Sequence, residues 1–228
     1  MPGQRPSGAS VRKPKPTAAP VASAVVDRVM MWLSTSRRID GLWVGTYSNA
    51  GQVMPRVEEA LALIKTRDPL RYRRILKDVG RVWVNLTPGV AARFKFRIRT
   101  CELDERFVLA ETSSPEAIAA VIVHEATHAR LEHRGIGYDE RIRGRVEGVC
   151  ARRELAFAKL LPDGEQAREA AEARLALPLA TWTDAAGLER NLQASLEILR
   201  DRGAPSWMIR WAERRGRGKA RTIASRVT

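Results

Sequence analysis

The segment His-Glu-Ala-Thr-His at residues 124–128 constrains the fold of this chain more than any other feature of the sequence. The chain has three histidines, and two of them stand four residues apart around a glutamate. On an α-helix such residues lie on the same side, one turn from each other, so both imidazoles can reach one point in space. Ala117, Val121 and Leu131 extend this spacing as an apolar stripe, so we expect a helix whose buried side carries both histidines.

Two imidazoles on successive turns of a helix form half of a metal site. Each can offer one nitrogen to a zinc ion at about 2 Å, and zinc lowers the pKa of a bound water to about 7. The side chain of Glu125 points toward the same place, where it can take a proton from that water and later return it. Buried imidazoles without a metal would need hydrogen-bond partners for four ring nitrogens, which is costly. We therefore predict that His124 and His128 bind Zn²⁺ and that Glu125 is the general base.

Hydrophobic periodicity predicts a mainly helical α+β fold with a small sheet in the middle of the chain. Alternation predicts three strands, expected to form an antiparallel sheet just before the histidine helix, at residues 81–86, 93–99 and 107–110. Helical spacing and cap residues predict helices at residues 22–37, around 57–64, and at 68–78, 115–133, 139–161, 165–176, 184–202 and 205–215. A loop that contains glycine and tryptophan is expected at residues 41–52.

Positive charge is concentrated at both ends of the chain. The net charge is +14, yet residues 1–20 carry four basic residues and no acid, and residues 210–228 carry seven basic residues against one acid. We expect residues 1–20 and 216–228 to be disordered basic tails that flank one domain over residues 21–215. Such tails can contact nucleic acid weakly and without sequence specificity. The alternating segment 93–99 would add a strand with one cationic face.

The cysteines and the apolar segments indicate the cellular compartment in which we expect the protein. The two cysteines, Cys101 and Cys150, do not make a disulfide framework and favour a reduced protein in the cytoplasm. The sequence has no run of 18 apolar residues, so we expect no membrane-spanning helix. The apolar segment 18–33 is interrupted by Asp27 and Arg28, so we expect no secretory signal there.

A His-Glu-x-x-His helix that follows an antiparallel strand and precedes another helix resembles the zincins, a group of zinc metallopeptidases. In the gluzincin branch of this group, a glutamate on the next helix is the third metal ligand. The resemblance assigns that part to Glu147, nineteen residues after His128. Glu154 lies on the same helix face, about 10 Å further along, and is the alternative. Gluzincins commonly have an acid four residues after the ligand to orient a zinc histidine. Here that residue is Ala151, so Glu154 or a backbone carbonyl would have to act instead.

Three other residues are alternatives for the third ligand. The metzincin pattern would need glycine at Leu131 and histidine at Arg134, so His133 stands one position early. Peptide deformylases use an upstream cysteine, but the residues around Cys101 do not match their motif. Cys150 lies on the same expected helix as the glutamate ligand, where it could face the site or be an ordinary core thiol.

The resemblance also implies how a substrate binds. Zincins hold an extended peptide beside an edge strand, and residues 107–111 occupy the matching place before the histidine helix. The oxygen of the scissile carbonyl needs a further donor, for which we select Tyr138 over Arg141 and Arg143. The sequence thus predicts a zinc-dependent metallohydrolase, a peptidase that acts on a peptide or protein. The alternatives are a zincin-like module that binds metal without catalysis and a basic protein associated with nucleic acid.

Overall fold

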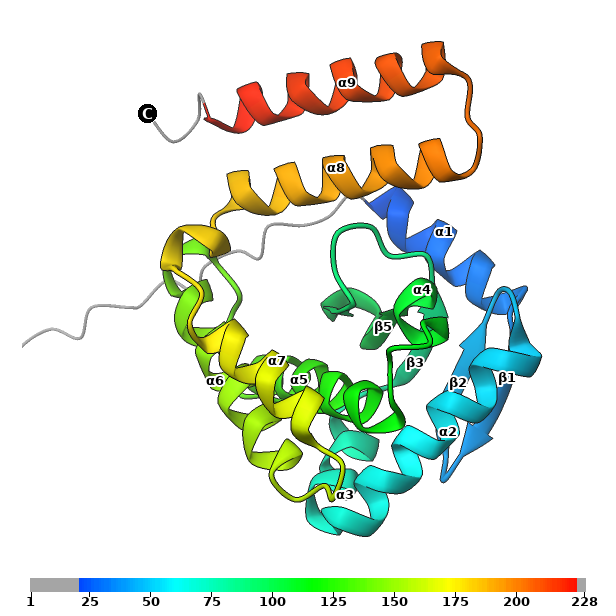
Figure 1. Cartoon of the computed structure of the whole chain (residues 1–228), viewed down its shortest axis with the longest axis vertical. Helices are drawn as coiled ribbons and strands as arrows, with labels where there is room; N and C mark the ends of the chain where they lie inside the picture. Colours follow the sequence, from blue (N-terminus) through cyan, green and yellow to red (C-terminus); the bar gives the residue numbers. More distant parts are fainter. Residues whose placement is uncertain (1–20, 225–228) are drawn as a thin grey trace, which may run out of the picture.

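The computed structural model describes residues 21–224, with side chains described from residue 25 to residue 218. The described residues form a five-stranded mixed sheet surrounded by helices (Figure 1). The predicted mixture, mostly helical with a small sheet before the histidine helix, is therefore confirmed. The predicted tail at residues 1–20 lies outside the described residues. Residues 216–224, which we expected in the second tail, continue the last helix.

The strands are β1 (Thr35–Ile39), β2 (Leu42–Thr46), β3 (Arg81–Asn85), β4 (Ala92–Lys95) and β5 (Thr100–Asp104). Their order across the sheet is β1-β2-β3-β5-β4. The three central strands run parallel, whereas β1 and β4 pair antiparallel at the two edges. The predicted three-stranded antiparallel sheet is therefore too small and has the wrong strand directions at its centre.

The helices are α1 (Val21–Trp32), α2 (Ala50–Arg67), α3 (Pro69–Asp78), α4 (Glu105–Leu109), α5 (Pro115–His133), α6 (Glu140–Ala158), α7 (Glu165–Leu175), α8 (Asp184–Asp201) and α9 (Ser206–Ala224), with 3-10 turns η1 (Phe96–Ile98) and η2 (Leu179–Trp182). The starts of α3 and α5 are the predicted ones, because Asp68 and Ser114 each precede a proline and accept a backbone N–H of the first turn. None of the helices within residues 21–224 is long and apolar enough to cross a membrane.

Residues 35–46, which we expected as the end of a helix and the start of a loop, form the hairpin of β1 and β2. Its turn is Asp40-Gly41, where φ is 48° and 87°. A two-residue turn with positive φ at both positions matches the twist of paired strands, and Asp-Gly is a favoured sequence for it. The hairpin extends the sheet on the side away from β4.

The third predicted strand, residues 107–110, is wrong because most of these residues belong to α4. The chain leaves β5 at Asp104, whose carboxylate accepts the backbone N–H of Arg106 at 2.8 Å and so caps the new helix. The strand that takes this place in the sheet is β5, which begins at Thr100, and all five of its residues are buried.

The predicted strand 93–99 ends early and does not present an open cationic face. The chain turns into η1 after Lys95, and Arg99 has a φ of 48°. Arg93 and Lys95 lie 2.5 and 2.9 Å from the carboxylate of Glu102, which is fully buried in β5. Lys95 also pairs with Asp27 of α1 at 2.9 Å, so two carboxylates balance the two positive charges of β4.

The two faces of the sheet pack against different elements. Val82 and Val84 of β3 join the main core, which residues of α2, α3 and α5 complete. Trp83, between them, points to the opposite face and packs with Met31 of α1. α5 contacts α2 on one side and α6 and α7 on the other, so it is buried over most of its surface (Figure 1). The histidine motif therefore lies on a central, well-fixed helix.

Candidate metal centre

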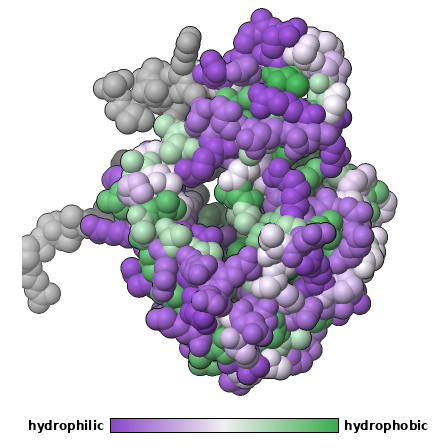
Figure 2. Space-filling model, in the orientation of Figure 1, coloured by the Kyte–Doolittle hydropathy of each residue, from purple (hydrophilic) through white to green (hydrophobic). Residues whose placement is uncertain are grey.

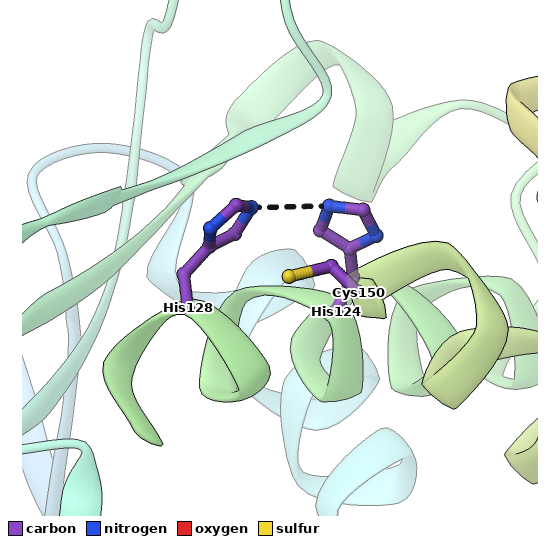
Figure 3. A group of neighbouring side chains, drawn as sticks. All are labelled: His124, His128 and Cys150. Atoms are coloured by element: carbon purple, nitrogen blue, oxygen red, sulfur yellow. Dashed lines mark hydrogen bonds between the residues drawn. The ribbon is translucent and has the colours of Figure 1, made fainter. Parts of the chain in front are cut away.

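α5 and α6 bring the candidate ligands together. The imidazoles of His124 and His128 project from successive turns of α5, and these residues are only 4% and 6% exposed (Figure 3). Glu147 lies on α6, which packs along α5. Gly135, with a φ of 79°, ends α5 and begins the turn that leads to α6.

The three predicted ligands face one another. The Nε2 atoms of His124 and His128 are 3.3 Å apart. Glu147 places Oε2 3.2 Å from the first of these nitrogens and Oε1 3.5 Å from the second. Ligand atoms bound tetrahedrally to zinc at 2.0–2.1 Å lie about 3.3–3.4 Å from each other. Each of the three separations is thus close to that between two zinc ligands, with Glu147 presenting one carboxylate oxygen to each imidazole.

Glu154 contacts the other nitrogen of the same imidazole. Its Oε2 lies 2.8 Å from Nδ1 of His124, and Arg174 of α7 donates to that oxygen as well. A carboxylate on the second nitrogen fixes the tautomer and the orientation of a metal-binding histidine. Of the two glutamates weighed from the sequence, Glu147 therefore lies at Nε2 of His124, the nitrogen that faces His128, and Glu154 lies at Nδ1.

Arg174 was not among the site residues predicted from the sequence, and it is fifty residues from His124 in the chain. Ala167 and Ala171 are the buried residues of α7, and Arg174 follows them at helical spacing. An arginine that continues the buried stripe of a helix needs a buried anionic partner. This spacing in the sequence indicates that Arg174 has a buried acidic partner, but it does not identify which acid.

Tyr138 lies against the site from the turn before α6. Its hydroxyl donates to Oε1 of Glu147, and its ring meets that of His128 edge-on, with the centroids 5.1 Å apart. The guanidinium of Arg143 lies 5.0 Å from the centre of the tyrosine ring. Burial and the charge of Glu147 raise the pKa of Tyr138, so the phenol keeps its proton. Tyr138 is thus a proton donor at the edge of the site.

Glu125 is buried without a hydrogen-bond partner. It is 6% exposed, and within residues 25–218 no group forms a hydrogen bond or ion pair with its carboxylate. Burial raises the pKa of Glu125 to about 7. A carboxyl group of this kind can take up and release a proton near neutrality.

The surroundings of the two imidazoles shift their pKa values in opposite directions, so that His124 is protonated and His128 is neutral. Burial disfavours protonation of His124, but its contacts with Glu147 and Glu154 raise its pKa to about 9. Burial also acts to raise the pKa of Glu147, yet the two histidines lower it to about 2. Burial and the charge of His124 lower the pKa of His128 to about 3, so this imidazole is neutral.

The buried charges fit a divalent cation. Metal binding requires both imidazoles to be neutral. In that state the carboxylates of Glu147 and Glu154 stand against a single guanidinium, that of Arg174, and Glu125 adds a second net negative charge when it is deprotonated. Buried charges are costly unless they are balanced, and a divalent cation between the imidazoles would balance this excess and favour deprotonation of Glu125.

Cys150 supplies a further donor atom. His124, His128 and Cys150 form a buried group whose ligand atoms all lie within 4.8 Å of one another (Figure 3). Burial raises the pKa of the Cys150 thiol. The remaining sequence candidates lie outside this group, since Cys101 is in β5 and His133 is exposed at the end of α5.

No protein-family profile, no curated protein and no solved structure matches this chain. The chemistry of the site must therefore follow from its own residues. Those residues are two imidazoles and a carboxylate at metal-binding distances, a second carboxylate that orients one imidazole, and a third carboxylate without a partner.

The Glu154→Gln substitution should weaken zinc binding by about 10- to 100-fold, because an amide orients His124 less strongly than a carboxylate does. Competition with a chromophoric chelator measures this affinity. Glu132→Gln, which changes an exposed glutamate on α5, serves as the control and should bind zinc as the wild type does. Equal affinity in Glu154→Gln and wild type would show that Glu154 does not orient the ligand.

Proposed function

We propose that this chain is a zinc-dependent metallohydrolase that cleaves peptide bonds. One observation chiefly supports the proposal: His124, His128 and Glu147 stand 3.2–3.5 Å apart, which is the spacing of three zinc ligands. Three protein ligands with a free fourth position are typical of catalytic rather than structural zinc sites. The unpaired, buried carboxylate of Glu125 supplies the base that such a site needs.

The residues divide the work as follows. A zinc ion held by the three ligands would polarise the substrate carbonyl and make a water molecule more acidic. Glu125 would accept a proton from the attacking water and deliver it to the leaving amine. Glu154, held by Arg174, would keep Nε2 of His124 directed at the metal.

Tyr138 can act as a donor to the substrate only if its hydroxyl changes its hydrogen-bond partner. A phenol has one proton, and the hydroxyl of Tyr138 donates it to Glu147. The predicted role as donor to the substrate oxygen therefore requires the hydroxyl to exchange Glu147 for that oxygen. The contact of its ring with His128 keeps it within reach of the same point.

The substrate strand in this proposal is β4, because residues 107–111 do not form a strand. Within the described residues β4 is the last strand of the sheet and pairs with β5 alone. The backbone N–H of Asp104 donates to the carbonyl oxygen of Ala91 at 2.8 Å. In an antiparallel pair every second residue bonds to the partner strand, so the N–H and C=O groups of Ala92 and Phe94 point away from β5. These groups can pair with an extended peptide.

β4 leads directly to the candidate ligands. Phe96, just after the strand, lies 6.0 Å from the ring of Tyr138, which in turn contacts His128. Figure 2 shows a recess in the surface between the regions that Figure 1 assigns to α6 and β5. A peptide added to the open edge of β4 would run past the imidazoles.

The test is hydrolysis of quenched fluorogenic peptides by the full chain loaded with one zinc ion. We expect cleavage that 1,10-phenanthroline abolishes and added zinc restores, because the metal is required for the reaction. The metal content of the same samples should rise and fall with activity. Zinc-loaded protein that cleaves no peptide of a diverse library would contradict the proposed function.

Cys150 favours a second candidate, a closed metal site without catalysis. If its thiolate took the fourth position beside the two histidines, no place would remain for water. Cobalt substitution distinguishes the two arrangements, because a cobalt–thiolate bond gives an intense near-ultraviolet band. For the hydrolase we expect no such band and unchanged zinc content in Cys150→Ala, with Cys101→Ala as the control for loss of a buried thiol. A band that disappears only in Cys150→Ala would favour the closed site.

A further inference from the structure

The last helix of the chain has an exposed face made of tryptophan and arginine. α9 packs against α8 through its other side, where a Cβ at Gly216 would overlap Leu192. On the outer side Trp207 and Trp211 are 62% and 52% exposed. We name this surface the Arg/Trp face; it consists of five exposed residues on one side of the helix, Trp207, Arg210, Trp211, Arg214 and Arg215.

The positive charge of the Arg/Trp face is not balanced by acids. Among the described side chains none of its three arginines forms an ion pair, and Glu213, the acid of this helix, pairs with Arg217 at 2.6 Å. From residue 214 to residue 228 the sequence contains no acid. The guanidinium of Arg215 lies 5.2 Å from the ring of Trp211, so a cation–π contact holds the two groups side by side.

We propose that the Arg/Trp face binds single-stranded nucleic acid. Unpaired bases stack on exposed indoles, and arginines neutralise the phosphates between them. Trp207 and Trp211 lie one turn apart, about 6 Å along the helix axis, so bases of one strand can stack on both. The upper part of the molecule, which α8 and α9 form, is largely hydrophilic in Figure 2.

Other anionic partners fit this face less well. A duplex keeps its bases paired and stacked inside, so the two indoles would find no bases to stack on. A membrane-bound helix inserts a broad apolar side into the lipid. The apolar side of α9 is turned the other way, because Met208 and Ala212 share the stripe of Gly216 that faces α8 and are half-buried.

This proposal does not depend on the proposed hydrolase function. The Arg/Trp face contains none of the candidate ligands, and α9 packs on α8 rather than on α5 or α6. Binding is therefore expected to be the same with zinc and with a chelator. A change in binding after chelation would place the nucleic-acid contact at the metal centre instead.

Fluorescence anisotropy of a labelled 20-nucleotide oligothymidine, titrated with the full chain at several salt concentrations, tests the proposal. The double substitution Trp207→Ala/Trp211→Ala should weaken binding by about tenfold or more, because it removes the two indoles on which bases stack. Arg210→Gln/Arg214→Gln/Arg215→Gln should reduce the slope of log K against log salt by about 0.7 per arginine. A duplex of equal length should bind more weakly than the single strand.

Matched substitutions elsewhere separate the Arg/Trp face from general basicity. Trp32→Ala removes another exposed tryptophan, and Arg73→Gln/Arg74→Gln/Lys77→Gln removes three exposed positive charges from α3. Both controls should bind like the wild type, with all variants shown to be folded by circular dichroism. Equal loss in the controls, absence of any binding to the oligonucleotide, or retention by phosphatidylserine vesicles but not by the oligonucleotide would each overturn the proposal.

Discussion

Glu125→Gln should reduce peptide hydrolysis by about 10²- to 10⁴-fold and leave zinc bound, because the amide cannot accept a proton from water. Glutamine has the size of glutamate, and in the described part of the chain no group is bonded to the carboxylate that it replaces. The three candidate ligands are therefore untouched. The measurement is kcat/KM for a fluorogenic peptide together with zinc per chain for both proteins.

The stability of the same variant gives an independent check. A buried carboxylate without a partner costs free energy, so its replacement by an amide should leave Tm unchanged or raise it. Glu154→Gln serves as the comparison, since it changes a buried glutamate that does bond to His124 and Arg174. This substitution should lower Tm because those bonds are weakened. If Glu125→Gln lost its zinc, or kept both its zinc and full activity, Glu125 would not be the base.

Local sequence features were enough to predict most of the helices. Asp68-Pro69 and Ser114-Pro115 mark helix starts because the acid or hydroxyl caps the first turn and proline fits its first position. The predicted helix 115–133 has the bounds of α5. Capping and backbone geometry act within a few residues, so they can be read without knowledge of the rest of the fold.

The strands were harder to predict because their residues depend on distant partners. Glu102 puts a charged residue in the middle of β5, yet this residue is fully buried because Arg93 and Lys95 of the neighbouring strand pair with its carboxylate. β5 is buried at all five residues and so gives no alternating exposure, whereas β3 matches the strand predicted at residues 81–86. The β1–β2 hairpin differs, because its Asp40-Gly41 turn was visible in the sequence.

The residues of the candidate site also differ in how far the sequence predicts them. The helical spacing of His124 and His128 follows from the sequence alone, and the resemblance to gluzincins led to Glu147, which lies within 3.5 Å of both imidazoles. The helical spacing of Arg174 with Ala167 and Ala171 indicates a buried position, but its partner, Glu154, follows only from the packing of α7 on α6. Side chains related by spacing on one helix are thus easier to predict than contacts that form when separate helices pack together.

Glu147→Ala should remove most of the stabilisation that zinc gives the fold. A ligand that binds only the folded state stabilises it by about 4 kcal/mol at 1,000 times its Kd. In a chain of this size about 1 kcal/mol corresponds to 2–4 °C in Tm. We therefore expect zinc to raise the Tm of the wild type by about 8–16 °C and that of the variant by much less, as differential scanning calorimetry with zinc or chelator would measure.

The comparison must be made within each variant, because Glu147→Ala also deprives Tyr138 of its acceptor and His124 of a partner. These losses lower Tm with or without zinc, so they cancel in the zinc-induced shift. Glu154→Gln should give an intermediate shift, since it weakens zinc binding without removing a ligand. An undiminished shift in Glu147→Ala would mean that another donor completes the site. Cys150, within 4.8 Å of the imidazole nitrogens, is the group in position to do so, and adding Cys150→Ala would then abolish the shift.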